Sequence, residues 1–362
     1  MNSDTSQRLI TSIANQTTTR VGKLSSLSPT DALKSLEAFV EINILGQLPK
    51  TNNLIWFNGV SVDLNRLSTQ DHFPLIGAYL DVISRLPTQY QYTNSINLFI
   101  ECCEQIGWVS KSSHVTGDEY GRASLQSVVI ADISLESYRH FVEILRARGN
   151  TETYRYLRAQ TKRAVSERYK TCCDYVDALF ENNDRLNVLR IDLAYSKEHC
   201  CFFSLADILN DLDHLTANMA NNAIFSGLAG YIFKVEYGVE KGVHVHAIFF
   251  FNGSERRGAS HIFHAQQIGE YWVRVITKGT GIYWNCNDQV KNFESLQTRG
   301  LGPMHWSDTS LRENLLNIVV HYVCKERQAV KSKLQPDRKM IRKKVLPRVR
   351  EVKLGRPRHL WL

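Results

Sequence analysis

The hydrophobic pattern of the chain changes its period at Asn182-Asn183-Asp184, and this change limits the folds that the chain can adopt. Before this point, apolar residues recur at helical spacing in residues 29–44, 75–86, 96–108, 134–149 and 151–181. After it, apolar and polar residues alternate, which is typical of strands with one buried face. We therefore expect a mainly helical module over residues 1–184 and an α+β domain over residues 185–330.

The second segment has a regular order of predicted elements. Strands are expected at residues 186–195, 231–237, 243–251 and 282–286, and helices at 204–221, 264–278 and 311–328. Ser204 and Asp207 have the spacing of a capping box at the start of the first of these helices. The order β-α-β-β-α-β-α predicts a ferredoxin-like (RRM-like) antiparallel sheet with one additional helix at its carboxyl end.

Composition narrows the class of protein. A chain of 362 residues with 43% hydrophobic residues is long enough for two ordinary domains with their own cores. No run approaches the roughly 18 apolar residues of a membrane helix, and the amino terminus lacks the apolar core of a signal peptide. We therefore expect a cytoplasmic protein of a bacterial host with no membrane partner, and we interpret its eight cysteines as reduced thiols without a structural zinc site.

The basic residues are concentrated at the carboxyl end. Residues 331–362 contain 12 Lys and Arg against two acidic residues, whereas the remaining chain has 32 basic and 34 acidic residues. Such a basic tail can follow a phosphate backbone, and the alternative is a solvated run of charge. We favour DNA contact by the residues Arg338, Lys339, Arg342, Lys343 and Lys344.

The predicted hairpin brings polar residues together. If Tyr237 pairs with Val243 across a five-residue turn, Glu236 lies opposite His244, and Lys234 lies opposite His246. Two imidazoles and a carboxylate on one face could then bind one ion, and Mg²⁺ or Mn²⁺ fits a phosphate-processing site with this mixed donor set. Lys234 could neutralise a phosphate beside the ion. The simpler interpretation is a half-buried strand whose polar face happens to hold two histidines.

The last predicted helix carries a second candidate group. Tyr322 and Lys325 are three residues apart, so both can approach one phosphate from the same helical face. A phenol with an ordinary pKa of about 10 is a poor nucleophile at neutral pH and needs a metal or a cation beside it. An amphipathic helix also often carries Tyr at its core boundary and Lys in water, so the motif alone is weak.

In combination, these residues resemble a known superfamily. Glu236, the strand 242–251 with its His244-Val-His246 core, and Tyr322-x-x-Lys325 are similar to the HUH endonucleases, named for a His-hydrophobic-His strand. The likeness is greatest to inovirus-type phage rolling-circle replication initiators and to the YagK/YfjJ carboxyl-terminal domain family. The strand at 189–195 is similar to that family's first strand motif, and the resemblance covers residues 186–328.

The resemblance implies a chemistry. His244, His246 and a third polar ligand, Glu236 or alternatively Asp192, would hold the metal, and Tyr322 would form a covalent 5′-phosphotyrosine link. Because Tyr322 follows the His pair and no second Tyr lies one turn away on its helix, the chain resembles single-tyrosine initiators. The expected substrate is single-stranded or supercoiled DNA at an origin, with Lys234 and Arg190 as further DNA contacts.

Three functions compete at this stage. The leading hypothesis is a DNA-nicking and joining enzyme that initiates rolling-circle replication. The first alternative is a non-catalytic DNA-binding prophage protein with the same fold, and the second is a transposase of the same superfamily. The amino-terminal module could bind origin DNA, contact host replication proteins or only support the catalytic domain.

Overall fold

A computed structural model describes most of the chain. The described residues are 27–45, 54–57, 60–64, 67–87, 89–109, 133–254, 261–288, 300–325, 331–333 and 337–346. They form two compact units, which divide between Thr161 and Lys162, and the short segments 238–240 and 331–333 group with the amino-terminal unit. Among the described residues, no helix combines the length and the hydropathy that crossing a bilayer would require.

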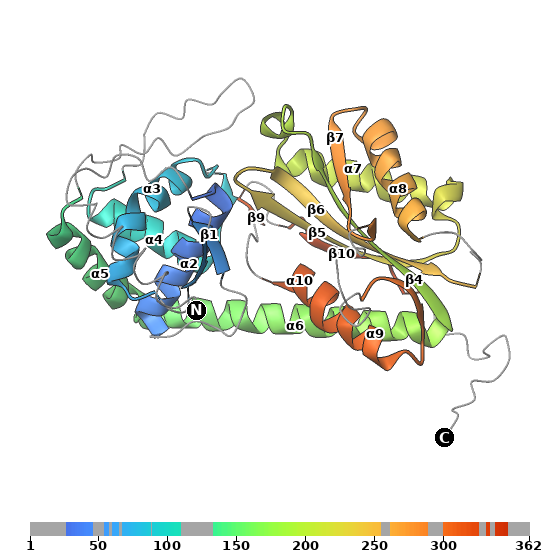
Figure 1. The fold of residues 1–362 in the computed structure, drawn as a ribbon, viewed down its shortest axis with the longest axis horizontal. Helices are drawn as coiled ribbons and strands as arrows, with labels where there is room; N and C mark the ends of the chain where they lie inside the picture. Colours follow the sequence, from blue (N-terminus) through green and yellow to red (C-terminus); the bar gives the residue numbers. More distant parts are fainter. Residues whose placement is uncertain are drawn as a thin grey trace. The chain divides into compact units, whose positions relative to one another are not determined.

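The amino-terminal unit is mainly helical, as its hydrophobic spacing predicts (Figure 1). Its α-helices are α2 (Pro29–Leu45), α3 (Ile76–Ser84), α4 (Asn94–Gln105) and α5 (Leu135–Gly149). Thr93 and Ser134 cap the last two of these helices by accepting backbone hydrogen bonds. Short strands, which the helical pattern did not predict, pair as β1 (Leu54–Phe57) with β2 (Val60–Asp63) and as β3 (Tyr90–Gln91) with β9 (Lys331–Ser332).

The long helix α6 (Glu152–Asn182) contributes to the carboxyl-terminal unit from Lys162 onward. The sequence placed the domain boundary at the end of this helix. The structure divides the chain inside it because its second half buries apolar side chains such as Tyr175, Leu179 and Phe180 against the sheet. A helix with one apolar face must cover that face with another element, and here the sheet covers it.

The carboxyl-terminal unit contains an open antiparallel sheet in an α+β arrangement. The strand order is β10-β5-β6-β4-β7, and β8 pairs with β4 beside β7. Its strands are β4 (Arg185–Tyr195), β5 (Leu228–Gly238), β6 (Gly242–Asn252), β7 (Gly281–Asn285), β8 (Gly302–His305) and β10 (Ile341–Lys343). The first four predicted strands are confirmed, while β8 and β10 are too short to give a clear alternating pattern.

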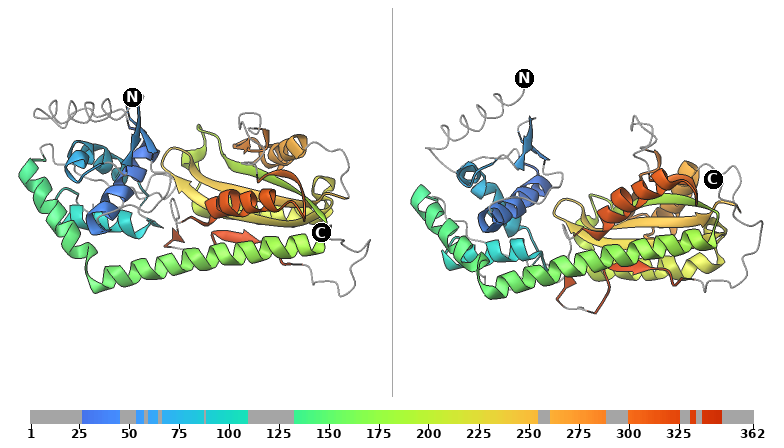
Figure 2. Two further views of the ribbon diagram at one scale, coloured as in Figure 1. Left: turned by 60° about the horizontal axis from the view of Figure 1, so that its bottom comes forward. Right: turned by 90° about the horizontal axis from the view of Figure 1, so that it is seen from below.

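Helices pack on both faces of this sheet (Figures 1 and 2). One face carries α7 (Leu205–Asn218), which starts with the predicted Ser204–Asp207 capping box, and α8 (His261–Tyr271). The other face carries α6 and the closing helical segment, whose side chains share a core with Ile232, Ile248 and Phe250. Alternation along the strands supplies apolar side chains to both layers.

The closing helical segment runs without a break from Thr309 to Cys324 and contains a π-helical stretch. It comprises α9 (Thr309–Asn314), a π-helical stretch η9 (Leu315–Val320) and α10 (His321–Cys324). The sequence predicted a helix to residue 328, but Lys325 already has an extended backbone, and residues 326–330 lie outside the described residues. A π-helical turn inserts extra backbone into a helix and changes the direction in which later side chains point.

The core beneath the closing segment can be tested with a matched pair of phenylalanines. Phe250 is fully buried against α6, whereas Phe263 on α8 is 56% exposed. We expect Phe250→Ala to reduce the free energy of unfolding by about 3–5 kcal/mol, because it leaves a cavity between sheet and helix. Phe263→Ala should cost less than about 1 kcal/mol. Urea unfolding followed by circular dichroism measures both, and equal losses would contradict the described core.

Candidate metal centre and neighbouring tyrosine

Register places the candidate polar residues on one face of the sheet. Asp192 on β4 is directly opposite His246 on β6, and Ala194 is opposite His244. Directly paired residues in a sheet point to the same side, so the two histidines share a face with Asp192. Val243 and Val245 alternate with the two histidines along β6 and are fully buried on the opposite side of the sheet, as the alternation predicts.

Glu236 from β5 completes a compact group with the histidines. Its Oε2 atom lies 3.2 Å from Nε2 of His246 and 3.7 Å from Nε2 of His244. One ligand atom from each of the three residues lies within 4.8 Å of the other two. All three side chains are buried, with exposed fractions of 3–5%. The hairpin prediction is therefore confirmed in its main consequence, which is that Glu236 meets both histidines.

The remaining ring nitrogens orient the imidazoles. Nδ1 of His246 lies 2.7 Å from Oδ1 of Asp192, and Nδ1 of His244 lies 3.1 Å from the backbone carbonyl of Gly242. A proton on each Nδ1 would donate to these acceptors and leave both Nε2 lone pairs directed at Glu236. Metal-binding histidines commonly use their second nitrogen in this way, which fixes the ring and its tautomer. Asp192, considered above as a third ligand, thus lies where it positions His246.

Gly242 has a local reason to be glycine. Its φ of +64° lies in the left-handed region, and a Cβ atom there would come within 2.9 Å of the Cys200 carbonyl oxygen. The turn between β5 and β6 is only residues 239–241, shorter than the predicted five residues, because both flanking glycines join the strands. This backbone directs the Gly242 carbonyl at His244.

The charges of this group are strongly coupled. Burial alone would raise the pKa of Glu236, but the hydrogen bond with His246 and the charge of Lys234 lower it to about 2. Burial and the neighbouring His246 lower the pKa of His244 to about 4. Burial also disfavours charge on His246, yet its hydrogen bonds with Asp192 and Glu236 raise its pKa above the ordinary value. At pH values below this raised pKa His246 carries an additional proton, which an ion would have to replace.

Distances and donor types fit a metal ion. Metal–ligand bonds of about 2.1 Å at right angles place donor atoms about 3 Å apart, which is close to the two Glu236–imidazole separations. The buried group Glu236, His244 and His246 could therefore hold a metal ion. The carboxylate of Glu236 would offset part of the charge of a dication, and the two neutral imidazoles would donate their Nε2 lone pairs to it.

Tyr322 lies directly against this group. Its ring centroid is 5.1 Å from that of His246, and the rings meet edge to face at 81°. The guanidinium carbon of Arg190 lies 4.4 Å above the Tyr322 ring, and Arg190 is also paired with Asp192. Tyr322 is 39% exposed, so the phenol connects the buried group to solvent. The structure thus brings Arg190, predicted as a DNA contact, to the candidate nucleophile.

Electrostatics around Tyr322 act in both directions. Burial and the carboxylate of Glu236 raise the pKa of its hydroxyl above the ordinary value, and Arg190 offsets only part of this rise. Nζ of Lys325 lies 5.5 Å from the Tyr322 ring centroid, so the two predicted residues are neighbours even though Lys325 follows the helix instead of belonging to it. Cations close to the ring favour the phenolate form that nucleophilic attack requires.

Lys234 has a different position from the predicted DNA contact. Its side chain is 2% exposed, and Nζ contacts Glu236 and donates a hydrogen bond of 2.6 Å to the carbonyl of Lys325. The side chain therefore neutralises Glu236 and holds the end of α10, and it does not face solvent. The predicted strand position of Lys234 indicated that it lies near the candidate metal ligands. It did not indicate which groups would bind its ammonium group.

Residues 337–346 of the basic tail contact the carboxyl-terminal unit and do not form a solvated run of charge. Arg338 and Arg342 both pair with Asp213 of α7, Lys343 donates to the Thr171 carbonyl, and Lys344 donates to the Leu228 carbonyl. Lys339 is exposed. Strand β10 covers the β5 edge of the sheet, which removes an unpaired edge. The basic residues beyond 346 lie outside the described residues.

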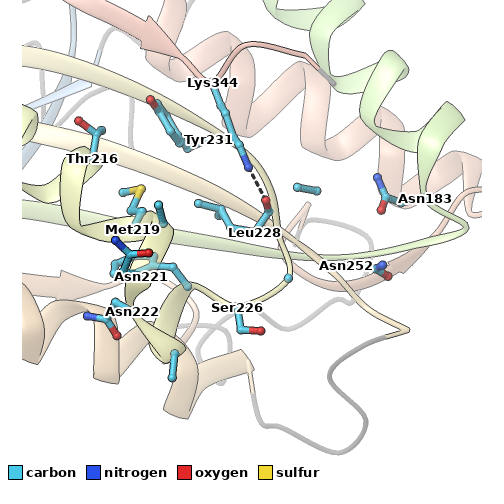
Figure 3. Close-up of a pocket in the computed structure, with 15 residues that line it drawn as sticks. Asn183, Thr216, Met219, Asn221, Asn222, Ser226, Leu228, Tyr231, Asn252 and Lys344 are labelled. Atoms are coloured by element: carbon cyan, nitrogen blue, oxygen red, sulfur yellow. Dashed lines mark hydrogen bonds between the residues drawn. The ribbon is translucent and has the colours of Figure 1, made fainter. Parts of the chain in front are cut away.

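A separate polar pocket of about 710 Å³ lies at the start of β5 (Figure 3). Four of its fifteen lining residues are asparagines, and Lys344, whose pKa is lowered by burial, donates a hydrogen bond to the Leu228 carbonyl. The asparagines are Asn183, Asn221, Asn222 and Asn252. The metal-ligand group does not line this pocket, so the pocket and the candidate metal centre are distinct places on the carboxyl-terminal unit.

No protein-family model, curated protein or solved structure matches the chain.

Metal binding should depend on pH in a direction set by His246. Because the pKa of His246 is raised above its ordinary value, an ion must displace a proton from His246 at pH values below that pKa, so affinity should rise with pH until the pH passes that pKa. Calorimetry with Mn²⁺ at pH 6 and pH 8, in buffers of different ionisation enthalpy, measures both affinity and proton release. We expect tighter binding at pH 8 and release of roughly one proton per ion at pH 6.

Two variants make this measurement specific. His246→Gln removes the titrating ligand and should abolish tight binding, whereas His140→Gln changes a histidine whose side chain is 64% exposed and should leave binding unchanged. An affinity that is the same at both pH values in the unaltered protein would exclude His246 as a ligand.

Proposed function

We propose that this protein is a metal-dependent DNA strand transferase of the HUH endonuclease type, in which Tyr322 cuts one strand and later rejoins it. The proposal includes the finer fold assignment: the strand order β7-β4-β6-β5 is the order of a ferredoxin-like sheet, which supports the resemblance. The single observation that carries the proposal is the contact of Tyr322 with His246 of the buried Glu236–His244–His246 group.

This contact has a chemical meaning that an isolated tyrosine would lack. The sequence separates Tyr322 from the histidines by more than 70 residues, yet the fold places their rings edge to face. A phosphate bound beside the histidines would lie within reach of the phenol. A purely structural tyrosine needs neither a carboxylate–imidazole group nor a guanidinium over its ring.

The reaction is a transesterification in which one phosphoester bond forms as another breaks. The oxygen of Tyr322 forms a bond to phosphorus, the bond between phosphorus and the 3′-oxygen breaks, and the phenolic proton is balanced by protonation of that 3′-oxygen. The products are a 5′-phosphotyrosine and a free 3′-hydroxyl. Because one phosphoester replaces another, the reverse reaction rejoins DNA without an energy source.

Each neighbouring residue has a role in this scheme. A bound dication would polarise the phosphate oxygens and offset the charge that develops on them. Arg190 stabilises the phenolate of Tyr322, and Asp192 keeps His246 in its ligand orientation. Lys234 neutralises Glu236 and fixes the end of α10, so it positions Tyr322 without contacting substrate.

The cofactor proposed is Mg²⁺ or Mn²⁺. Two imidazoles with one carboxylate favour Mn²⁺ over Mg²⁺ in binding strength, because Mg²⁺ prefers oxygen ligands and keeps its water molecules. The biological setting we propose is initiation of rolling-circle replication of a phage or prophage element, and it rests on the resemblance of the motifs. The competing proposal, a DNA-binding protein without turnover, predicts binding without a covalent product.

The nucleophile can be identified directly. With labelled single-stranded or supercoiled DNA carrying a candidate origin and with Mn²⁺, we expect a covalent protein–DNA adduct that survives denaturing electrophoresis. Tyr322→Phe should abolish it, because the ring remains but the attacking oxygen is lost. Tyr156→Phe removes a hydroxyl from a tyrosine that is 60% exposed on α6 and should leave the adduct yield unchanged.

Mass spectrometry of the digested adduct should then find the nucleotide on the peptide with Tyr322. An adduct on another residue would remove Tyr322 from the proposal. DNA binding with no adduct under any metal condition would support the non-catalytic alternative.

Arg190 should influence the pH dependence of nicking. Since Arg190 offsets part of the rise in the pKa of Tyr322, Arg190→Gln should raise this pKa further and reduce the phenolate fraction at neutral pH. We expect nicking to be slower by roughly 100-fold at pH 7, with the rising limb of the rate profile extended to higher pH. Arg190→Lys retains the charge and should recover part of the rate. An unchanged profile in Arg190→Gln would show that the guanidinium does not act on the phenol.

A further inference from the structure

The edge strand β7 exposes large apolar side chains on one side only. Ile282 is 48% exposed and Trp284 is 58% exposed. Tyr283, between them, points to the other side, where it lies so close to α8 that a Cβ on Gly269 would come within 2.2 Å of its ring. The strand therefore has a packed face toward α8 and an uncovered face that carries an indole ring.

Register shows which side of the sheet this uncovered face belongs to. Asp192 on β4 pairs with Trp284 on β7 and with His246 on β6. One row of side chains across three strands therefore runs from His246 through Asp192 to Trp284. The next row runs from His244 through Ala194 to Ile282. The exposed indole thus lies on the sheet face that carries the candidate metal group, two strand spacings or about 10 Å away.

We propose that Trp284, with Ile282 beside it, binds an unpaired nucleobase of the DNA strand whose phosphate lies at Tyr322. This inference rests on the proposed function and deepens it, because it selects single-stranded DNA from the two DNA forms considered above. In a duplex, the faces of a base are covered by its stacked neighbours and cannot meet an indole ring. An unpaired strand can place a phosphate at the candidate metal centre and a neighbouring base on the side chains of Trp284 and Ile282, which we call the platform.

The charges between the two places fit such a strand. Arg190 lies next to Asp192 in the middle of the sheet, between the Tyr322 ring and the row that leads to Trp284. Its guanidinium offers a cation to the phosphate backbone on the path from nucleophile to platform. Ala194, in the adjacent row, has only a methyl group, so the sheet surface between His244 and Ile282 is low. A strand crossing from β6 to β7 would therefore meet the guanidinium of Arg190 and the short side chain of Ala194.

The indole of Trp284 presents an apolar surface that a ligand can cover. An exposed indole of this size contributes a large apolar surface to water, whereas stacking with a base covers it on one face. A protein partner would also cover it, but the neighbouring metal group, Arg190 and Tyr322 favour an anionic polymer over an apolar protein surface.

The test separates base stacking from cleavage by using the Tyr322→Phe background, which binds but does not cut. Fluorescence anisotropy with a labelled oligonucleotide, in the presence of Mn²⁺ and at fixed salt, gives the affinity for single-stranded DNA, for the same sequence as a duplex and for single-stranded RNA. Trp284→Ala should weaken binding of the single strand by roughly 10-fold or more. It should leave the weaker, charge-driven binding of duplex nearly unchanged.

Conservative and control variants define the interaction. Trp284→Phe retains a stacking ring and should recover most of the affinity, whereas Trp284→Leu is apolar without an aromatic face and should not. Tyr156→Ala removes a comparably exposed aromatic residue far away in sequence and should have no effect. Indole fluorescence should be quenched by the oligonucleotide, and Trp284→Phe should remove most of that quenching.

The outcomes distinguish this inference from the proposed function. If Trp284→Ala binds single-stranded DNA normally while the protein with Tyr322 still forms an adduct, the nicking proposal stands and the platform is wrong. Equal loss of affinity for duplex and single strand would also overturn base stacking. Preferential binding of RNA would assign the platform to a different polymer and contradict the proposal.

Discussion

The buried carboxylate of Glu236 is the constraint on which the rest of the site depends. A lone charge with 3% exposure would be strongly destabilising, so it must be paired. Lys234 and His246 supply the pairing, and each then links the carboxylate to another element. Through Lys234 the charge holds the carbonyl that follows α10, and through His246 it reaches Asp192 on β4. The position of Tyr322 follows from these contacts, because its helix ends on the lysine that neutralises the metal-ligand group.

One face of the sheet serves two purposes along its length. Toward one end, Ile232, Ile248 and Phe250 form a core with α6 and the closing helical segment. Toward the other end, the same face presents His244, His246 and Asp192. There, Tyr322 of α10 and Arg190 of β4 lie beside these side chains. The apolar half supplies the stability that allows polar groups to be held without water in the other half. A site built on packed strands can hold donor atoms to the accuracy that metal binding needs.

The carboxyl-terminal residues illustrate how a basic segment acquires a structural role. Arg338 and Arg342 meet the same carboxylate, Asp213, and Lys343 and Lys344 donate to backbone carbonyls. The cations that were expected to bind DNA are therefore largely occupied by the domain itself, while β10 covers the β5 edge. On the opposite edge, β7 leaves Trp284 uncovered. In the proposal made above, polar and apolar recognition would be combined near the candidate metal-ligand group.

The sequence by itself determined the element types, because the helical period of 3.6 and the strand period of 2 are local properties. The predicted helices of both units, the strands β4 to β7 and the Ser204 cap are confirmed. The meeting of Glu236 with the two histidines is confirmed as well, because only a short turn separates their strands. Only tertiary structure decided that Arg190 lies over Tyr322, that Lys234 is buried, that α6 belongs partly to the sheet and that Lys325 leaves the helix. Those facts depend on contacts between residues far apart in the chain. A local pattern fixes which way a side chain points on its own element, but its partner is chosen by packing and charge compensation across elements.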